Sequence, residues 1–341
     1  MTDKISSIQI IGTQRSGSNL LRLILNQYDE ISAPHPPHVL KTFASLLPYY
    51  NDLKVEENFN LLANDITDFV NANPVPWNVN QIQAKELIRR SRNQSLLGLY
   101  ETLYVIKAEQ DNAVIWCCKS MFNEYYAREI EDEGIRPFYI YLYRDGRDVA
   151  ASFKRAIIGH KHIYHIASKW LKDQERALLV KEYVGDARFC MIKYEELISN
   201  PEKVLKSLST KLRLPYSPKL LDYYESSESQ RTASSGEMWK NVAKPIISDN
   251  TGKYRTELSD DEILMFENIA GKMVVKLGYP LNYTQESQKT YNDREVVKFD
   301  KLNAQWQEEA RKNASEHDLV VRSKQEEVLF NIKKRFSITV A

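Results

Sequence analysis

The chain has 341 residues and a formal net charge of +1 at pH 7, and this near-neutral balance excludes broad electrostatic binding to nucleic acid or to an anionic membrane surface. The mean hydropathy is −0.50, and no apolar run approaches the roughly 20 residues that span a bilayer, so we expect no transmembrane segment. A local basic pocket is compatible with these totals, and the length allows one to three domains.

The N-terminus and the cysteines indicate the compartment. The opening residues, MTDKISSIQIIG, have neither the long apolar centre nor the small-residue cleavage site of a signal peptide. Cys117, Cys118 and Cys190 lie in apolar runs without C-x-x-C spacing, so we expect reduced core residues and not disulfides or zinc ligands. Both observations favour a cytoplasmic protein.

Residues 10–20, IIGTQRSGSNL, join a short apolar run to a helical pattern and nearly spell a phosphate-binding loop. Gly12 and Gly17 have the spacing of G-x-x-x-x-G-K-[ST], but Ser18 stands where that motif has Lys, and Arg15 lies inside the loop. The N-terminus of a helix suits an anion because its free backbone N–H groups point at the ligand. The segment therefore predicts an anion site unlike that of a nucleoside triphosphate.

Four apolar runs are typical of buried strands in a parallel sheet, and they cover residues 8–12, 113–118, 138–143 and 188–194. Because helical stretches separate them, the sequence predicts an α/β fold, a three-layer sandwich with a central parallel sheet. The long segment 34–107 is mostly helical, with a break at NANPVPWN, and an excursion of this length predicts a helical insertion that forms a lid or an acceptor pocket.

A second candidate anion site follows the third strand, in YIYLYRDGRDVAASFKR. Arg144 closes the strand and Ser152 lies about two helical turns further on. A fixed guanidinium can bind a phosphate through two hydrogen bonds, and a helical Ser can add a hydroxyl donor. The alternative is a structural salt bridge from Arg144 to Asp145 or Asp148.

The C-terminal part changes character after a helix expected over 260–277, which ends before Gly-Tyr-Pro. Beyond 283 the sequence is highly charged and almost free of Gly and Pro, which predicts an appended helix. We therefore expect a main domain over 1–283, with the insertion 34–107, and a helical C-terminal extension over 284–341. The extension suits homo-oligomer formation, and a simple solvated helix fits it equally well.

Together, GTQRSGSNLL and YLYRDGRDVAASF resemble the PAPS-dependent sulfotransferase family, and the likeness covers about residues 7–282 in the right order. The resemblance implies a P-loop-like fold whose loop holds the phosphosulfate of 3′-phosphoadenosine 5′-phosphosulfate (PAPS), with PAP as product and no metal. In the family a Lys or Arg inside the loop belongs to this cradle. The matching residues here are Arg15, Ser16, Gly17, Ser18 and Asn19.

The same resemblance assigns roles outside the loop. Arg144 and Ser152 correspond to the anchors of the 3′-phosphate, and WCCKSMF places Lys119 where a cation approaches the sulfuryl group. FCMIKYEELISNP matches a stretch that brings Tyr194 near the adenosine. SDNTGKYRTELSDDE resembles a late segment that returns to the 3′-phosphate, which makes Lys253 a further candidate.

One departure from the family concerns the base. Many members carry a His two residues after the strand-end Lys, and this chain has Met121 there, which cannot accept a proton. SAPHPPHVL lies about where other members place a catalytic Glu, so His35, which falls nearest that position, and His38 are the candidates. Imidazole can take a hydroxyl proton near neutral pH. The alternative is a Pro-rich connector whose histidines only cap or pack.

A further group, GHKHIYH, contains His160, His162 and His165. No acidic or Cys partner lies nearby in the sequence, so we expect a solvated turn or a wall of the acceptor pocket and no metal site.

The function predicted by resemblance is transfer of a sulfuryl group from PAPS to a hydroxyl or amine of an unidentified small-molecule, lipid or carbohydrate acceptor. The acceptor stays open among carbohydrate, lipid headgroup, phenol, amine and peptide tyrosine. Two alternatives stay open. A non-catalytic relative would keep the PAP pocket or use the extension for assembly. A P-loop phosphotransferase would need the missing Lys and an acidic Mg²⁺ partner at a strand end.

Overall fold

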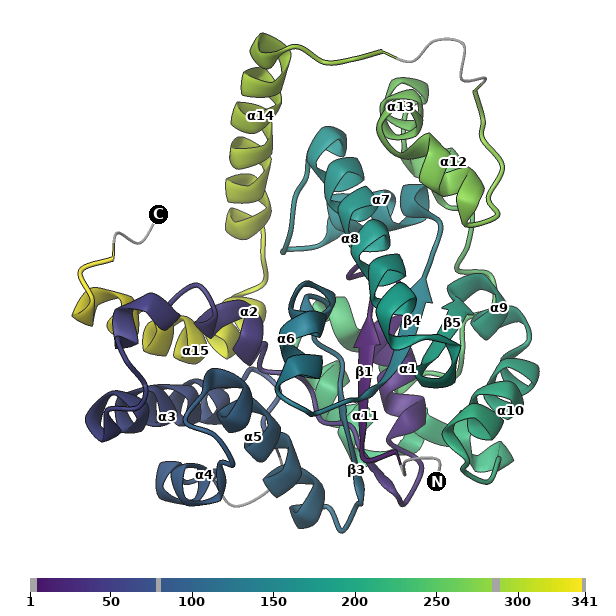
Figure 1. Cartoon of the computed structure of the whole chain (residues 1–341). Coiled ribbons are helices and arrows are strands. Elements are labelled where there is room, and N and C mark those ends of the chain that lie inside the picture. The colour runs from purple at the N-terminus through teal and green to yellow at the C-terminus, as the bar shows by residue number, and fades with distance from the viewer. Residues whose placement is uncertain (1–4, 78–80, 284–288, 339–341) are drawn as a thin grey trace.

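The computed structural model describes residues 5–77, 81–283 and 289–338, and it shows a parallel sheet between layers of helices (Figure 1). The predicted α/β class with a central parallel sheet is confirmed. Parts of the expected main domain (1–4), insertion (78–80) and C-terminal extension (284–288 and 339–341) lie outside the described residues.

The sheet has five parallel strands in the order β2-β3-β1-β4-β5. Their bounds are β1 (Ser7–Ile11), β2 (Ile31–Ser32), β3 (Ile115–Cys118), β4 (Phe138–Tyr143) and β5 (Phe189–Lys193). The sequence predicts all of them except β2, whose two residues are too few to show a strand pattern. β1 lies at the centre, between strands that follow it by a hundred residues or more.

Helices account for most of the remaining chain. They are α1 (Ser18–Leu25), α2 (Val39–Phe43), α3 (Glu56–Asn71), α4 (Ala84–Arg90), α5 (Leu96–Gln110), α6 (Ala127–Asp132), α7 (Gly146–Arg155), α8 (Ile163–Val184), α9 (Tyr194–Ser199), α10 (Pro201–Leu212), α11 (Ser227–Ser234), α12 (Tyr254–Glu257), α13 (Asp260–Lys276), α14 (Asp293–Lys312) and α15 (Glu316–Arg335). Short 3-10 segments are η1 (Leu47–Tyr50), η2 (Asn123–Tyr126), η3 (Asp186–Arg188), η4 (Pro218–Glu225) and η5 (Glu237–Ala243). Among the described helices none is long and apolar enough to cross a membrane.

Successive strand residues alternate between two helical layers. Ile8 and Ile10 of β1 join a core cluster with α1, α9 and α10, whereas Ile11 joins Tyr139 and Tyr141 of β4 in a cluster with α7, α8 and α13. Both faces of the sheet are therefore buried, which is why its strands read as nearly continuous apolar runs.

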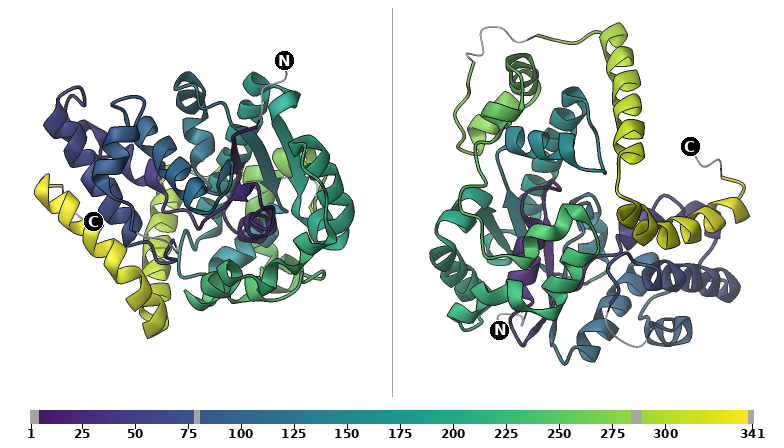
Figure 2. Two further views of the ribbon diagram at one scale, coloured as in Figure 1. Left: turned by 90° about the horizontal axis from the view of Figure 1, so that it is seen from below. Right: turned by 180° about the vertical axis from the view of Figure 1, so that it is seen from behind.

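The insertion and the C-terminal extension lie against each other. Helices α2 to α5 share an apolar cluster with Trp116 and Cys118 of β3. From α15, Ile332 is buried in this cluster, and Val328 and Leu329 cover it in part. Figures 1 and 2 show α15, in yellow, beside α3. The extension thus forms two helices, α14 and α15, instead of the single appended helix expected.

Helix α14 rests on the histidine group, which is covered and not a solvated turn. The ring of His162 stacks on Phe299 with centroids 4.4 Å apart, and His165 Nε2 lies 3.1 Å from Asp300 Oδ1. The side-chain oxygen of Asn303 accepts hydrogen bonds from the N–H groups of Lys161 and His162. The local sequence pattern misses this contact because α14 lies far away along the chain.

Candidate active site

The predicted site residues gather where the parallel strands end. Lys119 directly follows β3, Arg144 follows β4, and Tyr194 follows β5. Ligand-binding crevices form at this edge because the carboxyl ends of parallel strands meet there. The edge holds a cavity of about 350 Å³, and the predicted residues that line it are Arg15, Gly17, Ser18, Asn19, His35, His38, Lys119, Arg144, Ser152, Tyr194 and Lys253.

The charge of the cavity has one sign. The charged side chains that line it are Arg15, Lys119, Arg144, Arg155, Lys253 and Arg322, and no Asp or Glu is among the described lining residues. Cations that cluster in one cavity repel one another, and an anion bound between them relieves this repulsion. The arrangement therefore suits a ligand with several negative charges.

The loop after β1 forms one wall. Gly17 takes a left-handed conformation (φ 87°) directly before α1, and Arg15 does the same with φ 71°. Ser18 and Asn19 occupy the first turn of α1, where backbone N–H groups lack helical acceptors. Ser16 is buried outside the cavity lining, and its hydroxyl has no hydrogen-bond partner within the described structure.

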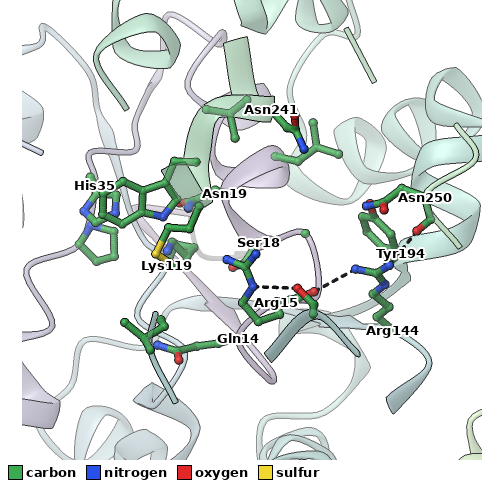
Figure 3. Close-up of a pocket in the computed structure, with 18 of the residues that line it drawn as sticks. Gln14, Arg15, Ser18, Asn19, His35, Lys119, Arg144, Tyr194, Asn241 and Asn250 are labelled. Carbon is green, nitrogen blue, oxygen red and sulfur yellow. Dashed lines mark hydrogen bonds between the residues drawn. The ribbon is translucent and has the colours of Figure 1, made fainter. Parts of the chain in front are cut away.

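Arg15 and Arg144 are held close together, with Arg15 between the two ends of the cavity (Figure 3). The Nε of Arg15 donates to Ser152 Oγ at 3.0 Å, and Arg144 donates to the carbonyl oxygen of Arg15 at 3.2 Å. Burial, followed by the charge of Arg144, lowers the pKa of Arg15 to about 10. Arg15 therefore stays cationic at neutral pH.

Arg144 makes one long ion pair, with Asp148, and several closer contacts. It donates to the carbonyl oxygen of Asn250 at 2.7 Å, and its guanidinium lies 4.5 Å from the ring centre of Tyr194. Its distance to Asp148 is 3.8 Å, and Asp145 instead holds Arg147 through two side-chain hydrogen bonds. The salt-bridge alternative therefore holds for Asp148 and not for Asp145, and the shorter contact of Arg144 is the one to Asn250.

The carboxylate of Asp148 also fixes the segment that contains Lys253. It accepts hydrogen bonds from the N–H groups of Gly252 at 2.7 Å and Tyr254 at 3.0 Å. Asn250 in the same segment donates to the hydroxyl of Tyr194 at 2.7 Å. The late segment is thereby tied to β4, α7 and the end of β5.

Lys119 is a buried cation of the site. Its side chain is buried, and it makes no hydrogen bond or ion pair with any residue that the structure describes. Burial, with Arg22 and Arg15 as neighbouring cations, lowers its pKa to about 7. A buried cation without a partner is costly, so this position favours an anionic ligand.

The two histidines differ in their surroundings. His38 Nδ1 lies 2.9 Å from Ser120 Oγ, which leaves Nε2 available, and His38 is partly exposed to the cavity. His35 is buried, with its ring 4.9 Å from that of Trp239, and its Nδ1 has no partner among the described residues. Burial, followed by the charge of Lys119, lowers the pKa of both imidazoles well below the usual value, so both are neutral near pH 7.

Several lining residues were missed by the sequence analysis. Met238 and Trp239 come from η5, and Arg322 and Gln325 come from α15. The expected insertion contributes lining residues at 35, 36, 38, 73 and 74 only, as far as the structure describes it. A signal for α15 was present, because Val328, Leu329 and Ile332 form an apolar stripe at helical spacing inside the charged extension.

The chain resembles known proteins over most of its length. A family model described as "Sulfotransferase family" matches residues 7–218. Protein-tyrosine sulfotransferase A of Caenorhabditis elegans is 23% identical over 315 residues, which is 91% of this chain and 74% of that protein.

Two solved structures share the fold. The sulfotransferase domain from the curacin biosynthetic pathway has a TM-score of 0.54 and 20% identity, over 82% of this chain and 100% of that one. The sulfotransferase domain of the Synechococcus PCC 7002 olefin synthase has a TM-score of 0.53 and 21% identity, over 79% of this chain and 96% of that one.

Proposed function

The chain belongs to the sulfotransferase family, and from this premise we propose that it transfers the sulfuryl group of PAPS to a hydroxyl or amine of an acceptor and releases PAP. One observation carries the choice of donor. Lys119 is a buried cation without a partner in the described structure, and it lies in a cavity that no described carboxylate lines. A donor with a phosphosulfate and a 3′-phosphate supplies the missing negative charges.

The orientation of the donor follows from where the cations lie. Figure 3 shows Lys119 and His35 at one side of the cavity, Arg144 and Tyr194 at the other, and Arg15 between them. We assign the 3′-phosphate and adenosine to the side of Arg144 and Tyr194, where Ser152 and Lys253 also line the cavity. The phosphosulfate then lies over the loop and reaches toward Lys119.

The chemistry resembles phosphoryl transfer, in which the protein contributes mainly positioning and electrostatic stabilisation. As the bridging S–O bond breaks, negative charge develops on the departing phosphate. Arg15 and the loop N–H groups are placed to stabilise that charge. Lys119 faces the transferring group, and a nearby anion raises its pKa above the value of about 7, which keeps it protonated during the reaction.

His38 is the better candidate for the base. A general base needs a fixed orientation and one nitrogen that is free to accept a proton. The contact between His38 Nδ1 and Ser120 fixes the ring, and it leaves Nε2 free to face the acceptor. Sequence position favours His35, but His35 is more deeply buried, and its ring lies against Trp239. We therefore assign proton removal to His38 and a place in the wall of the acceptor site to His35.

Gly17→Ala is expected to weaken PAP binding by at least about tenfold, or 1.4 kcal/mol, in a calorimetric titration. A Cβ at Gly17 would lie 2.4 Å from the ring of Tyr194, which would then have to leave its place on Arg144. Gly134 is a matched control, because it has the same φ of +87° but a Cβ there would meet nothing within 4 Å. Gly134→Ala carries the same backbone strain, about 1–2 kcal/mol, and should bind PAP like the wild type. Equal losses in both variants would contradict the steric argument.

The competing functions make different demands on the site. A phosphotransferase needs carboxylates for Mg²⁺, and the described cavity lining supplies none. A non-catalytic relative would bind PAP and transfer nothing. We propose residues 1–283 as the catalytic domain, and we leave the acceptor open among small molecules, lipids, carbohydrates and, given the C. elegans relative, protein tyrosine.

Calorimetric titration with PAP and with ADP, both without added metal, tests the donor assignment. ADP lacks the 3′-phosphate, so we expect PAP to bind at least about tenfold more tightly, which corresponds to 1.4 kcal/mol. Equal affinities would remove the 3′-phosphate from the proposal. Binding of neither nucleotide would overturn the donor assignment altogether.

A further inference from the structure

Arg322 brings a cation into the cavity from a part of the chain that has no place in donor binding. It lies on α15, and its guanidinium lies 5.1 Å from the ring centre of Trp239. One guanidinium nitrogen lies 3.1 Å from the sulfur of Met238, and the buried Nε has no partner within the described residues. The proposed donor anchors come instead from the loop, the strand ends, α7 and Lys253.

The guanidinium of Arg322 forms no ion pair within the described chain. Two carboxylates of the same helix act on it electrostatically, Asp318 and Glu326. Asp318 accepts a hydrogen bond from Ser315, and Glu326 forms an ion pair with Arg311 at 2.7 Å. No carboxylate of the described chain lies within ion-pair distance of Arg322.

Arg322 belongs to the side of the cavity where the acceptor must approach. Trp239 contacts both Arg322 and the ring of His35. The charge of Arg322 also acts on His35 and His38, which lie near Lys119. An acceptor whose hydroxyl reaches His38 therefore has Trp239 and Met238 as an apolar wall and Arg322 beyond them.

We propose that Arg322 binds a carboxylate of the acceptor, so that the enzyme prefers small hydroxylated aromatic acids to their neutral analogues. This inference rests on the proposed sulfuryl transfer and names its acceptor class. The planar fork of a guanidinium fits a carboxylate through two hydrogen bonds. Trp239 and Met238 line the cavity and offer apolar contact to the ring of such an acid. The C-terminal helix thus determines specificity and does not act on the reacting atoms.

The experiment measures binding of 4-hydroxyphenylacetate and of its amide to protein saturated with PAP, by calorimetry or ligand-observed NMR. In the wild type the acid should bind at least about tenfold more tightly than the amide, and Arg322→Gln should abolish this difference. Arg322→Lys keeps the positive charge but loses the planar guanidinium, so this variant should keep part of the preference for the acid over the amide. Lys324→Gln is the matched control, since it removes a charge from an exposed position of the same helix and should bind like the wild type.

Three outcomes would overturn the inference: equal binding of acid and amide, no binding of the acid, or unchanged preference in Arg322→Gln. The PAP titration separates this inference from the proposed function. If PAP itself does not bind, the donor assignment is wrong. If PAP binds to all variants alike and the acid shows no preference, only the role of Arg322 is wrong.

Discussion

Replacing His38 with Gln is expected to slow sulfuryl transfer by about 10²–10⁴-fold, the usual contribution of a positioned general base. The amide cannot accept the acceptor proton, but it can keep the contact with Ser120. The affinity for PAP should change by no more than about twofold, because His38 lies outside the proposed donor contacts. Turnover of PAPS is followed with the acceptor found by screening or, without one, with water as the slow acceptor.

His35→Gln provides the comparison. It removes the imidazole that sequence position favours, and on our assignment it should slow turnover much less than His38→Gln. A larger loss in His35→Gln would transfer the role of base to His35. If both variants lost PAP binding equally, neither histidine would be the base.

The pH dependence offers a second check on the base. Burial, followed by the charge of Lys119, lowers the pKa of His38, so the imidazole stays neutral and able to accept a proton below its ordinary pKa of about 6.5. The acid limb of the rate profile should therefore lie well below pH 6.5. That limb should be missing from His38→Gln.

Arg144→Ala is expected to weaken PAP binding by about 10- to 150-fold, because hydrogen bonds to charged groups contribute about 1.5–3 kcal/mol and each 1.4 kcal/mol is tenfold. ADP binding should change little, since ADP has no 3′-phosphate for Arg144 to hold. Calorimetric titration of both nucleotides therefore measures the loss of discrimination directly.

Two controls separate this loss from general damage. Arg89→Ala removes the same charge from an exposed position of α4 and should leave both affinities unchanged. Thermal unfolding of Arg144→Ala shows whether the lost contacts to Asn250 and Tyr194 destabilise the fold. An equal loss of PAP and ADP affinity would show that Arg144 shapes the site without selecting the 3′-phosphate.

The sequence predicts the cavity residues of the proposed donor side because they belong to short contiguous patterns. Arg15 lies inside a loop between strand and helix, and Arg144 and Lys119 each follow an apolar strand directly. Parallel pairing then brings these strand ends to one edge, whatever the length of chain between them. Local sequence pattern and sheet topology are therefore sufficient to predict that these residues lie close together.

The acceptor side could not be predicted in the same way. Trp239 and Arg322 lie in segments without a chemical motif, and they meet only because α15 covers the apolar surface of the insertion. The charged composition of the extension indicates helix but does not say which helix face is buried. The choice between His35 and His38 likewise depends on Ser120, a contact across 82 residues of sequence.

The arrangement of β1 between β3 and β4 also has a consequence for folding. The groups that we propose to bind the donor follow strands that pair across long stretches of sequence, so they come together only when the whole sheet has formed. A chain in which any central strand has separated loses several donor contacts at once. Bound nucleotide should therefore raise the free energy of global unfolding and leave local fraying unchanged. The expected increase is about 2.7 kcal/mol at a free nucleotide concentration one hundred times Kd. Donor occupancy would then govern how long the folded chain persists as well as whether it can react.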